Sequence, residues 1–189
     1  MELEELTLRL ILFVILPLWV ICGSLDYFCH RATKIEENSG VWESFHHSIM
    51  GVQVGVPIWL GIYCEINVLV LLICFACFIV HEWTAHNDVV VAVHAREVTP
   101  REQHIHSYLI TIPFYVLSLT ICRNWQTFLD TISFRWSGQL NFVLREEPLG
   151  TSTYVAWYAF LMLVVAVIPY TEELIRCVRY SWNNRSDAA

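Results

Sequence analysis

Long apolar runs, each comparable to the thickness of a lipid bilayer, are the feature that most constrains this chain of 189 residues. A helix needs about 20 apolar residues to cross the hydrocarbon core of a membrane. Hydrophobic residues make up 56% of the sequence and charged residues 15%, whereas soluble domains have roughly 45 to 50% and ~25%. We therefore predict an all-α polytopic membrane helix bundle that forms a single domain over residues 1–189.

The boundaries of the spans follow from the polar residues between the runs. The apolar stretch from 49 to 80 is too long for one ordinary span, and Glu65 and Asn67 divide it into a helical hairpin. Thr99 and Glu102 form a capping-box pattern with Pro100 at the first helical position, which marks the start of the next helix. The five predicted transmembrane helices lie at about 6–30, 41–63, 66–88, 100–122 and 154–176.

An amphipathic segment separates the last two predicted spans. Between 123 and 145, apolar residues such as Trp125, Leu129 and Ile132 recur at steps of three or four, with polar residues on the other side. This pattern is typical of a helix that lies in the headgroup plane of a membrane. A loop with scattered aromatic residues is the alternative. We predict one interfacial helix at about 123–145.

Five crossings in sequence put the end of the first helix, the start of the second, the end of the third and the start of the fourth on the same side of the membrane. All eight histidines belong to that side. The positive-inside rule predicts that this side is cytoplasmic, because it carries seven of the 11 Lys and Arg residues. Those seven cationic residues are Arg31, Lys34, Arg96, Arg101, Arg176, Arg179 and Arg185.

The acidic start Met1 to Glu5 and the lack of a small-residue cleavage site argue against a removable signal peptide.

Charge and cysteine content exclude two further classes of protein. The net charge of -7 is spread along the chain, and no basic stripe is present, so we expect no nucleic-acid partner. The seven cysteines are odd in number and mostly lie within or beside apolar helices, which does not indicate a disulfide framework.

Four carboxylates stand four residues before a histidine, beside the ends of the apolar runs. Residues at i and i+4 share a helix face, so each pair presents both side chains in one direction. Near the end of the third helix, His81 and Asp88 are seven residues apart and also share a face. The last helix returns to this level at Glu172 and Glu173. The candidate metal ligands are Asp26, His30, Glu43, His47, His81, Glu82, His86, Asp88, Glu102, His104, His106 and Glu172.

Structural roles compete with metal ligation at several of these positions. Glu102 has its capping role, and Glu82 with His86 matches an exposed helical ion pair. Carboxylates and histidines at membrane depth are nevertheless costly and tend to mark function. Carboxylate and imidazole groups that converge from facing helices are typical of di-metal bundles. We therefore predict two metal ions, iron first and zinc as the alternative. No haem is expected, since haem iron takes few oxygen ligands.

Three strings carry a resemblance to known proteins: Asp-Tyr-Phe-Cys-His-Arg (26–31), His-Glu-Trp-Thr-Ala (81–85) and Arg-Glu-Val-Thr-Pro-Arg-Glu-Gln-His-Ile-His-Ser (96–107). They resemble a family of small, functionally unassigned bacterial integral membrane proteins, which implies a bacterial inner membrane. More distantly, the chain is similar to the fatty acid hydroxylase and membrane desaturase superfamily. That resemblance implies two metal ions, usually iron, and oxidation of lipid chains with dioxygen. The chain lacks that superfamily's His-x3-His and His-x2-His-His boxes.

These patterns predict a membrane-embedded metalloenzyme, a di-iron oxidoreductase that acts on a lipid or another apolar substrate and receives electrons from a donor. A zinc-dependent membrane hydrolase of lipid amides or esters is the first alternative, because it needs only three protein ligands, a water and a carboxylate base. A metal-ion transporter or sensor is the second, although few polar residues besides Gln53 lie deep in the apolar runs. No pattern sets an oligomeric state.

Overall fold

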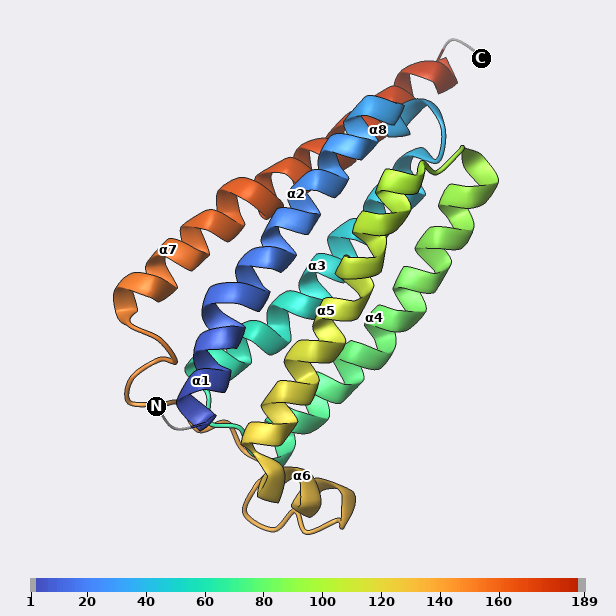
Figure 1. Ribbon diagram of the computed structural model, residues 1–189. Coiled ribbons are helices and arrows are strands. Elements are labelled where there is room, and N and C mark those ends of the chain that lie inside the picture. The colour runs from blue at the N-terminus through green and yellow to red at the C-terminus, as the bar shows by residue number, and fades with distance from the viewer. Residues whose placement is uncertain (1–2, 187–189) are drawn as a thin grey trace.

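Five long helical rods lie side by side in the computed structural model, which describes residues 3–186 (Figure 1). The first rod is α1 (Leu3–Leu10), a π-helical turn η1 (Ile11–Ile15) and α2 (Leu16–Thr33). A short 3-10 turn, η2 (Ile35–Glu37), leads to the second. The last rod is α7 (Ser152–Met162), a second π-helical turn η3 (Leu163–Val167) and α8 (Ile168–Ser186). Along the chain, the three rods between the first and the last are α3 (Gly40–Tyr63), α4 (Val68–Ala95) and α5 (Pro100–Arg123).

Four of these rods are long and apolar enough to cross a membrane, which confirms the all-α membrane bundle: Leu3–Thr33, Val68–Ala95, Pro100–Arg123 and Ser152–Asn184. The remaining rod, α3, has 24 residues and packs along α4 and α8. Large apolar side chains such as Phe13, Trp83 and Phe160 are exposed on the outside of the bundle. The structure therefore describes an integral membrane protein.

The predicted interfacial helix is correct only in its first part and wrong beyond Ile132. The short helix α6 (Trp125–Ile132) lies at the end of the bundle opposite the C-terminus (Figure 1). Phe134 and Gly138 then take left-handed φ angles of 56° and 74°, which a regular helix cannot include. The following backbone pairs with the connection between α3 and α4, where Glu65 N donates to Val143 O at 2.9 Å. We call residues 133–151 the closing loop.

The apolar core lies in the half of the bundle near the closing loop. Leu16 and Trp19 of the first rod pack there with Ile58 of α3, Ile112 of α5 and Tyr158 of α7. The other half, where α2 meets α3 and α4 meets α5, is the end to which the histidines belong (Figure 1). A core displaced toward one end leaves the other end free to hold polar groups.

Candidate metal centre

Polar side chains from five helices are buried together at the histidine end. We define the buried cluster as five carboxylates and three histidines, with the histidines supplied by α2, α3 and α5. Burial of this many ionisable groups in a membrane bundle is costly unless each group is compensated. The members are Asp26, His30, Glu43, His47, Asp88, Glu102, His106 and Glu173, of which His106 alone is half-buried.

Glu173 of α8 orients two histidines from different helices. Its Oε2 atom lies 3.1 Å from His30 Nδ1, and its Oε1 atom lies 3.1 Å from His47 Nδ1. A carboxylate accepts here, so each ring carries a proton on Nδ1, and a ring that is neutral presents its Nε2 lone pair. The two imidazoles stack with centroids 4.4 Å apart. Carboxylate to histidine bonds of this kind are the usual outer support of metal-binding histidines.

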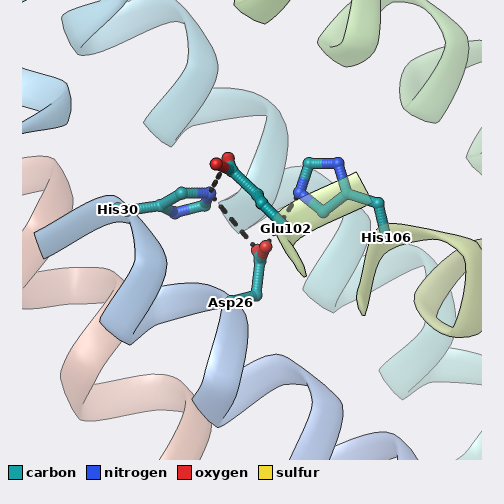
Figure 2. A group of neighbouring side chains, drawn as sticks. All are labelled: Asp26, His30, Glu102 and His106. Carbon is teal, nitrogen blue, oxygen red and sulfur yellow. Dashed lines mark ion pairs between the residues drawn. The ribbon is translucent and has the colours of Figure 1, made fainter. Parts of the chain in front are cut away.

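One group of potential ligands surrounds the Nε2 atom of His30. It lies 3.5 Å from Asp26 Oδ2 and 3.6 Å from Glu102 Oε1. His106 completes this group from α5, with Nε2 2.8 Å from Asp26 Oδ1 (Figure 2). One ligand atom from each of these four residues lies within 4.8 Å of the others. Two imidazoles with two carboxylates form a ligand set suited to iron or zinc.

A second group overlaps the first and extends toward α4. His30, Glu43 and His47 form another set whose ligand atoms lie within 4.8 Å of one another. His47 Nε2 also lies 3.4 Å from Asp88 Oδ2. The adjacent His46 reaches the same carboxylate from the side, with Nδ1 3.6 Å from Asp88 Oδ1. The cluster therefore offers two neighbouring ligand sets that share His30.

Arg96 covers the cluster from the connection between α4 and α5. Its Nη2 atom donates to Glu43 Oε1 at 2.5 Å and also to Glu102, while Nη1 donates to Glu102 Oε2 at 3.0 Å. Burial lowers the pKa of Arg96, but the hydrogen bonds to the two carboxylates outweigh burial and raise it above the usual value. The guanidinium therefore stays charged and offsets one of the buried negative charges.

Several buried atoms of the cluster have no hydrogen-bond partner within residues 3–186. They are His30 Nε2, His47 Nε2 and Asp88 Oδ1. Buried polar atoms are nearly always satisfied in folded proteins, and each exception needs an explanation. All three are acceptor atoms when the histidines are protonated only on Nδ1, so a donor or a cation would satisfy them. The residues present therefore fit a bound metal.

A cavity of about 380 Å³ adjoins the cluster. Asp26, His47, Asp88 and His106 form part of its wall, together with Tyr170, whose hydroxyl donates to the carbonyl of Gly23 at 2.8 Å. The rest of the wall is largely apolar. Val52, Val89 and Val167 line this cavity and are also exposed on the outside of the bundle, so the cavity opens through its side.

The structure brings together most, but not all, of the residues chosen from the sequence. Asp26 with His30, Glu43 with His47, and Glu102 with His106 all meet in the cluster, and Asp88 joins them. Thr99 caps α5 as predicted, with Oγ1 accepting from Glu102 N at 3.3 Å, and the Glu102 side chain is bonded to Arg96.

Other expected ligands lie outside the cluster. His86 and His104 are exposed, and Glu82 is half-buried and belongs to neither ligand set. Glu82 and His86 share α4 with Asp88, and His104 shares α5 with His106, but these side chains lie on other faces of their helices. His81 is buried but lies seven residues before Asp88, about 10 Å deeper along α4. Glu172 is half-buried and pairs with Arg31 at 2.9 Å. His94, which is not among the candidate ligands, is also exposed.

Sequence reasoning did not select the two residues that organise the cluster. The sequence places Glu172 and Glu173 at the same level of the bundle, and the candidate ligands include Glu172, whereas the structure buries Glu173. Tyr170 and Glu173 are three residues apart and share the inward face, which is a signal that could have identified Glu173. Arg96 lies in the connection between α4 and α5, where helical periodicity cannot predict which way a side chain points.

Comparison of the chain with known protein families, with curated proteins and with solved structures found no match. The resemblances drawn from the three sequence strings therefore stay predictions. The chemistry of the site rests on its own geometry.

Proposed function

We propose that the chain is a membrane-embedded metalloenzyme with two metal ions at the histidine end of the bundle. The observation that carries this proposal is the charge of the buried cluster. Its five carboxylates face one buried guanidinium, Arg96, which leaves a net charge of -4 when the histidines are neutral. Two divalent cations match that charge. Asp26, His30, Glu102 and His106 would hold one ion, and Glu43, His47 and Asp88 the other.

Among the metals that an oxidoreductase could use, iron suits this site best. The ligands are mixed oxygen and nitrogen, and the adjacent cavity leaves room for a substrate beside them. Iron would supply dioxygen activation. The overall reaction is insertion of one oxygen atom into a C–H bond, with the second oxygen atom released as water after two electrons and two protons arrive. The electrons come from a separate donor on the histidine side.

The shape of the adjacent cavity supports an apolar substrate. Its apolar wall and its opening through the side of the bundle suit a molecule that enters from the bilayer. Tyr170, in the wall of this cavity, would position that molecule against the cluster. We place the protein in a bacterial inner membrane, with the histidine end toward the cytoplasm.

Two alternatives predict different metal contents. A zinc-dependent hydrolase of lipid amides or esters would use one of the two ligand sets with a water and a spare carboxylate. A network of imidazolium and carboxylate pairs would also offset the buried charge, and it would hold no metal. Metal content therefore separates all three.

Metal analysis of the protein purified in detergent, with an absorption spectrum, tests the proposal. We expect two iron ions per chain and no Soret band. His47→Ala should lower the metal content to about one ion per chain, whereas His86→Ala, which changes an exposed histidine on α4, should leave it unchanged. One zinc ion per chain would support the hydrolase. No metal in the purified protein or after reconstitution with iron or zinc would refute both enzymes.

A further inference from the structure

A second cavity, of about 270 Å³, runs lengthwise through the half of the bundle that holds the apolar core. Leu12 of the first rod, Ile58 and Gly61 of α3 and Val116 of α5 line it, so its wall is largely apolar. Trp19, Gln53 and His81 bound it toward the buried cluster, and Arg123, Asn124 and Arg145 bound it at the opposite end.

The length and width of the second cavity suit one extended hydrocarbon chain. On α5 its lining runs from Ile112 to Arg123, which is about 16 Å at 1.5 Å per residue. A volume near 270 Å³ over that length leaves a narrow passage. It admits one acyl chain and excludes a phospholipid with two.

The outer end of the second cavity holds two arginines that form no ion pair within residues 3–186, although Glu4 also lines the cavity and Glu65 stabilises the charge of Arg145. Arg123 donates to the backbone carbonyl of Glu4, and Arg145 Nε donates to the carbonyl of Cys64 at 2.9 Å. Within residues 3–186, no carboxylate lies within ion-pair distance of either guanidinium, in contrast to Arg135 in the same loop, which pairs with Asp130 at 3.1 Å. Arginine binds carboxylates through parallel N–H donors. An anionic head group would therefore fit this end.

The inner end of the second cavity meets the cavity beside the cluster. Trp19 and His81 line both cavities. The side chain of His81 is only 4% exposed, and neither of its ring nitrogens has a hydrogen-bond partner within residues 3–186. A chain that fills the second cavity from its outer end would place its far end at this junction.

We propose that the second cavity binds a long-chain fatty acid, with the carboxylate at Arg123 and Arg145 and the methyl end at His81. The proposal rests on and deepens the proposed function, because the methyl end then lies where the second cavity joins the cavity beside the metal centre. Binding of the fatty acid rests on the second cavity alone and does not require the metal.

Binding can be measured with stearic acid that carries a spin label, using metal-free protein in detergent. We expect the protein to immobilise the label, palmitic acid to displace it, and hexadecanol to displace it at least tenfold less well. Arg145→Gln should weaken binding of the acid by about tenfold to a hundredfold, because a hydrogen bond to a charged group contributes about that factor to an affinity. Arg135→Gln should have no effect.

A matched pair of glycines on α3 tests the position of the chain. A side chain at Gly61 would enter the second cavity, whereas Gly55 lines neither cavity, and a Cβ atom at either position meets no atom within 4 Å. Gly61→Leu should abolish binding and Gly55→Leu should preserve it, with both variants retaining the wild-type metal content when loaded. Equal binding of acid and alcohol, or equal binding by both glycine variants, would overturn the proposal. Metal-free wild type that binds the acid but cannot be loaded with metal would refute the enzyme and leave this site standing.

Discussion

The two ends of the bundle are closed by different kinds of polar group. At the end opposite the histidines, backbone atoms of the closing loop pair with the connection between α3 and α4, as when Glu65 N donates to Val143 O at 2.9 Å. At the histidine end, buried carboxylates and imidazoles of five helices meet instead. A bundle end can therefore be closed without buried charge. This difference supports the proposal that the buried cluster serves chemistry rather than closure.

Removal of Arg96 should have the largest effect on this comparison. Arg96→Met would leave Glu43 and Glu102 buried without their counter-ion, and breaking a buried pair in this way costs about 3 to 5 kcal/mol. Reversible unfolding in mixed micelles would measure the loss. Arg101→Met, at an exposed position on α5, is the control and should change the stability little. Equal stability of the two variants would show that the cluster is not charged as proposed.

Loss of Glu173 should weaken metal binding with less harm to the fold. Glu173→Gln keeps the size of the side chain but can no longer accept from both His30 Nδ1 and His47 Nδ1. Outer partners of metal-binding histidines contribute about 10-fold to 100-fold in affinity. Competition with a chelator would measure the change. The neighbouring Glu172→Gln alters a half-buried residue that pairs with Arg31 and should leave the affinity unchanged. A similar decrease in both variants would count against the role of Glu173.

Two helix caps, one at each end of the bundle, allow the ends to be compared by substitutions that cost the same stability. Asn67 accepts from Val70 N at 3.1 Å at the start of α4, and Thr99 accepts from Glu102 N at 3.3 Å at the start of α5. Replacing either by alanine should cost about 1 kcal/mol of stability. Only Thr99→Ala should also lower metal affinity, because its helix start carries Glu102. Metal affinity that falls equally in both variants would mean that the ends are coupled through the whole bundle.

The smallest effect is expected at the surface of the histidine end. Arg31 and Glu172 form an ion pair at 2.9 Å, but their side chains are 50% and 41% exposed. Exposed pairs contribute about 0 to 1 kcal/mol and are screened by salt. Arg31→Gln should therefore change stability by less than 1 kcal/mol, and metal content should remain at the wild-type level. A larger loss would place the boundary of the functional cluster farther out than Glu173.

The sequence allowed the rods and much of the cluster to be predicted, because both depend on short-range periodicity. The apolar runs located the helices, and the step of four residues correctly paired Asp26 with His30 and correctly placed Glu102 and His106 in one group of side chains. Whether these residues bind metal stays a prediction. The same step also selected His86, which is exposed, since periodicity defines a face without saying whether that face points inward.

The remaining features depend on tertiary contacts. Glu172 and Glu173 differ by about 100° of helix rotation, and only the packing of α8 against α2 and α3 decides which one is buried. The closing loop continues an amphipathic pattern, but Phe134 takes a left-handed conformation that few non-glycine residues adopt. Arg96 is positioned by the turn between α4 and α5, where no repeat exists to follow.

The π-helical turn η3 has a consequence for how the last rod tolerates changes in length. A π-helical turn holds one residue more than an α-helical turn, while the helix on either side keeps its alignment. Deleting one residue within Leu163–Val167 would convert this turn to ordinary α-helix and leave Glu173 in phase with His30 and His47. The same deletion in the regular part of α3 between His47 and Tyr63 would rotate one half of that helix by about 100° relative to the other. The last rod can therefore be shortened in the middle of the membrane without misaligning the carboxylate at its far end.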